Sequence, residues 1–198
     1  IEAVHQNMDK MYRYMDLRKK AMGLDELHMY DIYATMLPEG DQVISFDQAR
    51  QDVLEATKVL GEEYSTVLAQ SFTDRWMDIY ENPPFVLLNH KDNLNSAFTL
   101  AHEMGHAMHS YFSSKYQAPI YSDYVLFVAE VASTCNESLL MQYLLKKTTD
   151  KRQRAVLINY FLEQFRTTVY RQTMFAEFEL KAHQMAEQGE TLTAESLS

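Results

Sequence analysis

The sequence contains little cysteine, glycine and proline. Of its 198 residues, five are glycine and four are proline, and Cys135 is the single cysteine. One cysteine cannot form a disulfide within the chain, which is typical of proteins in a reducing compartment. Because glycine and proline supply most tight turns, their scarcity favours a fold of long helices with few turns.

The sequence also lacks a long apolar run and an excess of positive charge. No stretch approaches the roughly 20 apolar residues that span a bilayer, and the N-terminus has no signal-peptide pattern, so we expect a cytoplasmic protein. The formal net charge of −10 argues against nucleic acid and against anionic membrane surfaces as partners. The apolar content of 46% is enough for one globular domain with a sizeable core.

One segment carries a metal-binding pattern. Residues 99–109 read Thr-Leu-Ala-His-Glu-Met-Gly-His-Ala-Met-His, in which His102 and His106 are four residues apart. On an α-helix, which turns once in 3.6 residues, both imidazoles lie on one face and can reach the same small cation. Glu103 lies about 100° round the helix, where a carboxylate can act on a bound water without being a ligand. The alternative is an ordinary amphipathic helix whose histidines lie in the core or at the surface.

Hydrophobic spacing and turn residues predict a mainly α-helical fold. Phe85–Leu88 is the best candidate for a strand, because two prolines precede this apolar run and polar residues follow it. We therefore expect a multi-helix core with one short strand or small sheet next to the helix that carries the metal pattern. The predicted helices, in chain order, cover residues 1–22, 45–60, 62–80, 94–114, 122–147 and 149–188.

A catalytic metal site needs a third protein ligand besides the two histidines. If the helix with the pattern ends near Ser114, His106 lies eight residues, roughly 12 Å, before the turn. An antiparallel helix that starts near Ser122 returns to this level after eight residues, at Glu130. Apolar and small residues surround Glu130 in the segment 127–133, where an unpaired carboxylate would be costly. The spacing therefore predicts Glu130 as the third ligand.

Two further residues are predicted to lie near this site. Glu137 follows Glu130 by seven residues, on the same helical face but roughly 10 Å further along the axis, too far to bind the same ion. It either holds a ligating histidine by its other ring nitrogen or is a solvated side chain. His109 either lines the site, as a candidate for substrate binding, or lies at the surface.

These residues predict a definite chemistry. Two imidazoles and one carboxylate suit zinc better than other common divalent metals. Zinc polarises a peptide carbonyl and lowers the pKa of its bound water. Glu103 would take the proton from this water as it attacks and pass the proton to the departing amine. The sequence thus predicts peptide hydrolysis with one zinc ion per chain.

The same residues resemble a known family. Residues 102–109, followed by residues 127–137, are similar to the oligoendopeptidase F branch of the thimet oligopeptidase family of zinc metallopeptidases. Residues 75–78, 85–89 and 165–179 match that family as well, so the resemblance covers nearly the whole chain.

The resemblance implies a metallopeptidase that cleaves short peptides inside a deep, mostly helical cleft. It implies that His102, His106 and Glu130 bind zinc and that Glu103 is the catalytic base. In the family, the strand before the metal-binding helix pairs with the substrate backbone. The resemblance therefore adds a candidate peptide-binding edge, which consists of Phe85, Val86, Leu87, Leu88 and Asn89.

The sequence departs from the family pattern at three places. The family carries a glycine-rich segment between the positions of residues 82 and 83. This segment is either deleted from the protein or present in it and missing only from these 198 residues. The histidine and tyrosines that stabilise the transition state in the family lie beyond the position of Ser198, and the N-terminal helical region is also lacking. Residues 1–198 are thus expected to be part of a single helical catalytic domain, weak or inactive as a fragment, and no oligomeric state follows from the sequence.

Two other functions are compatible with the residues. One is a non-catalytic helical module that binds peptide or metal, although a purely structural site has no need of Glu103. The other is a helical zinc aminopeptidase, which a peptide with a blocked amino terminus would distinguish from an endopeptidase. The absence of a recognition motif for a free amine favours the endopeptidase.

Overall fold

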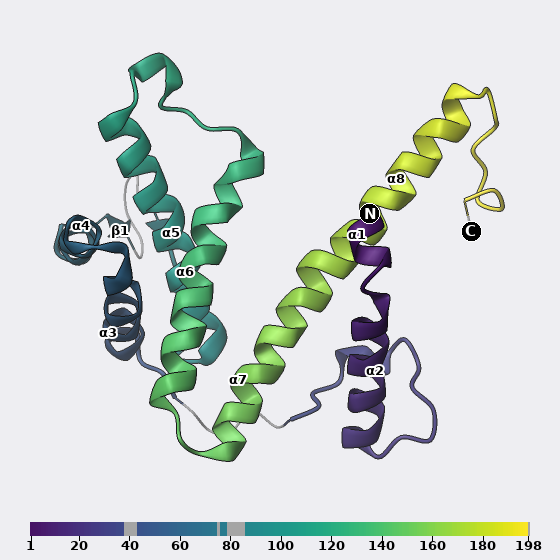
Figure 1. Cartoon of the computed structure of the whole chain (residues 1–198), viewed down its shortest axis with the longest axis horizontal. Helices are drawn as coiled ribbons and strands as arrows, with labels where there is room; N and C mark the ends of the chain where they lie inside the picture. The colour runs from purple at the N-terminus through teal and green to yellow at the C-terminus, as the bar shows by residue number, and fades with distance from the viewer. Residues whose placement is uncertain (38–42, 75, 79–85, 198) are drawn as a thin grey trace. The chain divides into compact units, whose positions relative to one another are not determined.

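The computed structural model describes residues 1–37, 43–74, 76–78 and 86–197 (Figure 1). Its elements are mainly helices, as the sequence predicts, and each follows in chain order: α1 Glu2–His5, α2 Met8–Met22, η1 Asp31–Tyr33, α3 Phe46–Thr57, η2 Lys58–Leu60, α4 Glu62–Thr73, β1 Met77–Asp78, β2 Val86–Leu87, α5 Leu94–Tyr116, η3 Pro119–Tyr121, α6 Leu126–Lys147, α7 Lys151–Gln164, η4 Phe165–Tyr170 and α8 Arg171–Glu187.

The chain forms two compact units. Unit 1 comprises residues 1–39 and 155–198, and unit 2 comprises residues 40–154. The predicted metal ligands all belong to unit 2, so this unit carries the candidate site.

Unit 2 is built from α3, α4, α5 and α6, of which α5 and α6 lie side by side (Figure 1). Two side chains fix where α3 and α5 begin. The Ser45 hydroxyl accepts a hydrogen bond from the Gln48 N–H at 3.3 Å, and the Asn93 side chain accepts one from the Ser96 N–H at 2.9 Å. The fully buried apolar residues of this unit include Val53, Leu68, Leu100, Met104, Met108, Leu140 and Met141.

Two extended segments pair beside this helical core. β1 and β2 run parallel, with Met77 opposite Val86 and Asp78 opposite Leu87. This pairing lies beside α5, but it spans only two residues in each segment. Phe85 and the predicted loop position between residues 82 and 83 lie outside the described residues.

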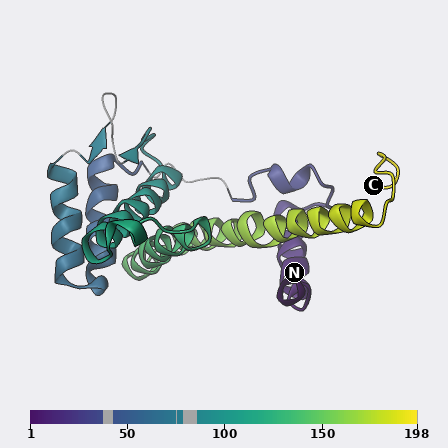
Figure 2. The same cartoon turned by 90° about the horizontal axis from the view of Figure 1, so that it is seen from above.

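Unit 1 contains α1, α2 and the long helical segment that begins in α7. Figure 2 shows α7, η4 and α8 as one continuous rod, in which η4 is a π-helical stretch between two α-helices. Gly23 ends α2 with a φ of 67°, a left-handed conformation that favours glycine, as the sequence predicts. Tyr14 and Arg18 are buried on α2, where both contact Glu163 of α7.

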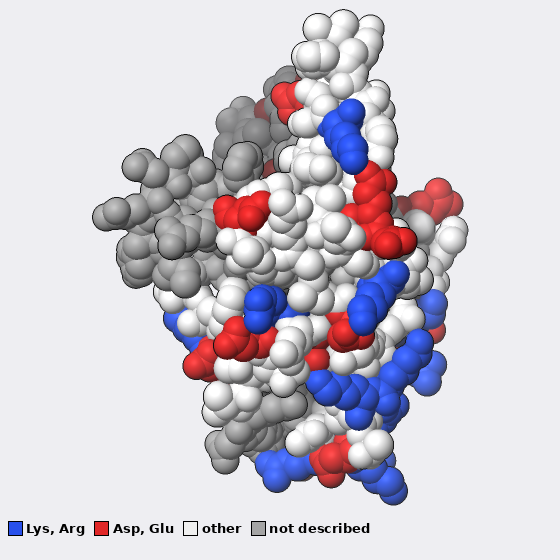
Figure 3. Space-filling model, turned by 90° about the vertical axis from the view of Figure 1, so that its left-hand side faces the viewer, with Lys and Arg blue, Asp and Glu red and all other residues white. Residues whose placement is uncertain are grey.

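Figure 3 shows both acidic and basic side chains on this face of the described residues, with several basic side chains adjoining one another at the lower right. Among those residues, no helix has both the length and the apolar character that crossing a bilayer requires.

Candidate metal centre

The centre depends on an unusually close approach between α5 and α6. A Cβ built on Gly105 would lie 2.6 Å from the Cα of Ser133, 2.8 Å from the carbonyl oxygen of Ala132 and 2.9 Å from the Ser133 nitrogen. All three atoms belong to the backbone of α6, so no side-chain rotation could relieve the contact. Glycine at position 105 therefore lets the two helices pack closely enough for a glutamate on α6 to reach histidines on α5.

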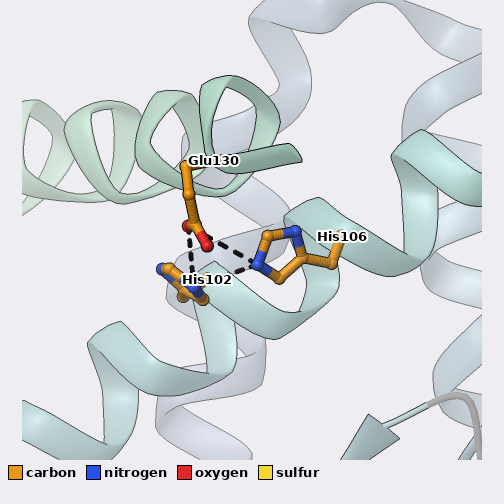
Figure 4. Close-up of side chains that lie close together, drawn as sticks. All are labelled: His102, His106 and Glu130. Atoms are coloured by element: carbon orange, nitrogen blue, oxygen red, sulfur yellow. Dashed lines mark hydrogen bonds and ion pairs between the residues drawn. The ribbon is translucent and has the colours of Figure 1, made fainter. Parts of the chain in front are cut away.

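Three side-chain atoms meet across this helix pair (Figure 4). The Nε2 atoms of His102 and His106 lie 3.1 Å apart. The Oε2 atom of Glu130 lies 3.3 Å from the first nitrogen and 3.6 Å from the second. The structure thus brings together the three residues that the sequence singles out as metal ligands.

The second ring nitrogen of His102 also has a partner. A carboxylate oxygen of Glu137 makes a short hydrogen bond with Nδ1 of His102. This bond raises the pKa of His102, the charges of Glu137, Glu130 and Glu103 raise it further, and burial opposes them. The imidazole therefore lies in a field that favours positive charge. If Nδ1 carries the proton of the neutral ring, Nε2 presents its lone pair toward His106 and Glu130.

The site is open on one side. The side chains of His102 and His106 are 28% and 26% exposed, and that of Glu130 is 57% exposed. Glu103 is half-buried on α5, and among the described residues it makes no hydrogen bond or ion pair. An open metal position with a free carboxylate beside it is the arrangement that a catalytic site needs and a closed structural site lacks.

The remaining candidates lie in several different settings. The His109 ring stacks on Tyr124 with a centroid distance of 3.8 Å, and burial lowers its pKa. Leu88 is half-buried and Asn89 is exposed after β2, which contains Val86 and Leu87. None of these contacts assigns a role in substrate binding, so that role stays a prediction.

Two residues of α6 that contact this site were not singled out from the sequence. The Ser133 hydroxyl donates to the Glu130 carboxylate at 2.8 Å, and the Asn136 amide donates to the Ala101 carbonyl at 3.2 Å. Both side chains are at most 1% exposed. Residues 130, 133, 136 and 137 lie on one side of α6, but Thr134, Ser138 and Gln142 of the same helix are polar too, so spacing alone does not single out Ser133 and Asn136.

The predicted start of the second helix is wrong. Ser122 or Asp123 was expected to cap this helix, but α6 begins at Leu126 after the short helix η3. The Ser122 carbonyl instead accepts a hydrogen bond from Ser113 at 2.6 Å, which ties the connection to the end of α5. Glu130 still lies beside His106, with 3.6 Å between Oε2 and Nε2. The first part of the return from the turn is made by η3 and the residues after it rather than by the second helix.

The helical pair carries His-Glu-x-x-His on one helix and a carboxylate within reach of both histidines on the next, a donor arrangement typical of metal-dependent hydrolases. Comparison with known proteins identifies the family: the model of peptidase family M3 matches residues 51–198. The chain belongs to peptidase family M3.

Individual relatives agree with this assignment. The chain is 41% identical to Oligopeptidase PepF of Bacillus subtilis and 40% identical to chromosomal Oligoendopeptidase F of Lactococcus lactis subsp. cremoris. Each alignment covers 100% of this chain but only 32% and 35% of the relative. The chain is also similar to the crystal structure of oligoendopeptidase-F from Enterococcus faecium, with 37% sequence identity and a TM-score of 0.72. This match covers 98% of the present chain and 29% of the Enterococcus faecium chain.

The chain therefore spans about a third of the length of the curated relatives that it matches. Both alignments run over 213 positions, more than the 198 residues of this chain. The relatives thus carry some residues with no counterpart here.

Proposed function

We propose that the chain carries the metal-binding centre of a zinc endopeptidase that hydrolyses short peptides. The observation that carries this proposal is the triangle formed by Nε2 of His102, Nε2 of His106 and Oε2 of Glu130. Membership of peptidase family M3 and the names of the relatives support a peptidase. Zinc and the individual residue roles are our inference from the donor set.

The donor atoms fit zinc in both kind and spacing. Ligands bound at about 2.0–2.2 Å to a tetrahedral zinc ion lie roughly 3.3–3.6 Å from one another. The three separations here are 3.1, 3.3 and 3.6 Å. Two imidazoles and one carboxylate also match the composition of many catalytic zinc sites, in which a fourth position stays open for water or substrate.

Glu137 supports the same assignment through His102. A carboxylate on Nδ1 holds the imidazole in one orientation and keeps the proton on that nitrogen. Nε2 is then the atom available to the metal. In this proposal Glu137 orients a ligand and does not bind the ion itself.

Bound zinc would supply a polarised substrate carbonyl and a more acidic water. Glu103 would accept the proton of the attacking water and deliver it to the departing amine. Its place next to His102 on α5, half-buried and without a partner among the described residues, suits a group that must take up and release a proton.

The substrate-binding candidates extend this proposal. β2 pairs with β1 on one side over two residues, and the resemblance to the family implies that a peptide backbone would add to this extended segment. The residues concerned are Phe85, Val86, Leu87, Leu88 and Asn89. We expect backbone pairing there to confer affinity with little preference for particular side chains.

Metal content tests the centre directly. We expect about one zinc ion per chain in protein purified without chelator, and much weaker zinc binding after Glu130→Ala. Lys115→Ala is a matched control, because this exposed residue of α5 pairs with Glu63 and not with the three donor atoms. An unaltered, folded protein that binds no zinc would contradict the proposal.

Catalysis is tested on the full-length gene product, because we expect the 198 residues alone to be weak or inactive. An internally quenched peptide with a blocked amino terminus should be cleaved. Glu103→Gln should keep the zinc but lower kcat by about 10²–10⁴-fold, the usual contribution of a general base. Cleavage only of peptides with a free amino terminus would indicate an aminopeptidase, and zinc binding without any cleavage would indicate a binding module.

A further inference from the structure

A chain of two hydrogen bonds joins three helices of unit 2 next to the candidate metal centre. The Tyr64 hydroxyl on α4 donates to Oδ1 of Asn136 on α6 at 3.0 Å. The Nδ2 of Asn136 donates in turn to the carbonyl oxygen of Ala101 on α5 at 3.2 Å. Asn136 is 1% exposed and Ala101 is fully buried, so solvent does not compete for the bond between them, whereas Tyr64 is half-buried.

The last bond of this chain ends one residue from a predicted metal ligand. The Ala101 carbonyl and the His102 N–H belong to the same planar peptide unit, so holding one fixes the other. The residue after Asn136 is Glu137, which contacts the ring of His102. Of these two consecutive residues of α6, Asn136 therefore holds the peptide group that precedes His102, and Glu137 holds the His102 side chain.

The hydrogen bond from Tyr64 helps to fix the orientation of the Asn136 side-chain amide. Because its hydroxyl occupies Oδ1, the Nδ2 group is directed at the Ala101 carbonyl, as this bond requires. Burial raises the pKa of Tyr64 to about 12, so the hydroxyl keeps its proton and remains a donor near neutral pH. Without this hydroxyl, Oδ1 would be buried without a partner, and only the bond to the Ala101 carbonyl would hold the orientation of the amide.

The rotation of α6 about its axis links the Asn136–Ala101 bond to the position of Glu130. Seven residues separate Glu130 from Glu137, which brings the two side chains to within ~20° of each other around the helix. A rotation of α6 that loosens Asn136 from Ala101 would therefore move both carboxylates relative to the histidines. The Tyr64–Asn136 bond opposes such a rotation.

We propose that Tyr64 is a positioning residue of the metal centre, which acts through Asn136 on His102 and on the two glutamates of α6. This inference rests on the proposed zinc site. It extends that site to a third helix, α4, which carries none of the donor atoms.

The test is the zinc dissociation constant of the purified protein, measured by competition with a chromophoric chelator. We expect Tyr64→Phe to weaken zinc binding about tenfold, at the low end of the range for partners of metal ligands. Tyr116→Phe is the matched control, because Tyr116 is exposed at the end of α5 and its hydroxyl donates at 2.7 Å to Glu63 of α4 rather than to Asn136. This control should leave zinc affinity unchanged.

A double-mutant cycle separates positioning from general stability. Asn136→Leu should also weaken zinc binding, and Tyr64→Phe should have little further effect in the Asn136→Leu background, because Tyr64 acts through Asn136. The absorption spectrum of the Co²⁺-substituted protein should change in both single variants, since the ligand geometry changes. A role in folding alone would lower the melting temperature of the metal-free protein and leave both the zinc affinity and the spectrum as they are.

Three results would overturn this inference. Equal zinc affinity in Tyr64→Phe and the unaltered protein would do so, as would additive losses in the double variant. Absence of zinc binding by the unaltered protein would remove the proposed function and this inference together. Loss of affinity in Tyr64→Phe with retention in Tyr116→Phe would support it.

Discussion

Each unit of the chain holds a carboxylate among several polar groups, but the two carboxylates are neutralised differently. In unit 1, Glu163 pairs with Arg166 at 2.7 Å and with Arg18 at 3.3 Å, and it accepts a short hydrogen bond from Tyr14. Two permanent guanidinium charges therefore lie within reach of this glutamate. Its countercharge is part of the chain.

In unit 2, Glu130 faces a different set of groups. Its partners are the two imidazoles of the candidate centre and the Ser133 hydroxyl at 2.8 Å. Within the part of the chain that the structure describes, no lysine or arginine pairs with it. Histidine carries a full positive charge only below its pKa, so the positive charge here must come from protons or from a bound cation. The difference between the two carboxylates is the one expected between a structural ion cluster and the proposed metal site.

The comparison predicts that zinc stabilises one unit and not the other. At a free zinc concentration 1,000 times the dissociation constant, unit 2 should gain about 4 kcal/mol against unfolding, because the ion binds only the folded site. Hydrogen exchange of the slowest amides in α5 and α6 should slow accordingly, and amides in α2 and α8 should not change. Chelator should reverse the effect.

Glu130→Ala is the control for this measurement, since it should remove the zinc response of α5 and α6. Slower exchange in both units to the same extent would contradict the comparison, because it would mean that the metal stabilises the chain as a whole.

Gly105→Ala tests whether the centre depends on the close approach of α5 and α6. A Cβ at 2.6 Å from the Ser133 Cα must push the helices apart, because ordinary contacts are 3.4–4 Å. We expect a loss of about 1–3 kcal/mol in the free energy of unfolding, measured with urea, and weaker zinc binding. Ser114→Ala, on the same helix, should change neither. Unaltered zinc affinity in Gly105→Ala would show that the distance between the helices does not set the site.

The helices were predictable because their signals are local. The signals at Gly23 and Ser45 correctly predict the end of α2 and the start of α3. The helix predicted over residues 1–22 is instead divided into α1 and α2, and α3 ends at Thr57, before the short helix η2. The α4 prediction was too long: the helix ends at Thr73, and residues 77–78 pair with β2. Helical spacing continues in the sequence past Thr73, so only pairing with a distant segment could reveal this end.

The site was predictable where one helix or one antiparallel pair determines it. His102 and His106 follow from the helical period, and Glu130 follows from counting residues on both sides of a turn. Asn136 and Tyr64 could not be identified in this way, because their bonds depend on how α4 packs against both helices. The division into two units was equally invisible, since α7 continues across their boundary.

Glu163→Gln tests the other half of the comparison. Removing the charge leaves Arg18 and Arg166 without a carboxylate partner among the residues that the structure describes, so we expect the free energy of unfolding to fall by about 1–2 kcal/mol at neutral pH. Zinc affinity should not change. Glu187→Gln, an exposed substitution near the end of α8, is the matched control and should have almost no effect in urea unfolding.

The effect of Glu163 should also depend on pH. Burial alone would raise the pKa of Glu163, but hydrogen bonds from Arg166 and Tyr14 and the nearby guanidinium charges outweigh burial and lower it below the ordinary value of 4.5. A lowered pKa in the folded state adds stability above pH 4.5 that disappears as pH falls through the folded pKa. The difference between the unaltered protein and Glu163→Gln should therefore shrink in acid. A difference that stays constant down to pH 2 would contradict this account.

Ser133→Ala should have the smallest effect and sharpens the account of Glu130. The Ser133 hydroxyl donates to the Glu130 carboxylate, so its removal frees a ligand to rotate without removing any donor atom. We expect zinc binding to weaken about two- to fivefold, a cost below the ~1.4 kcal/mol of a tenfold change. Thr134→Ala is the matched control, because the Thr134 hydroxyl donates to backbone carbonyls and not to the Glu130 side chain. Equal losses in both variants would mean that α6 as a whole, rather than the orientation of Glu130, limits metal binding.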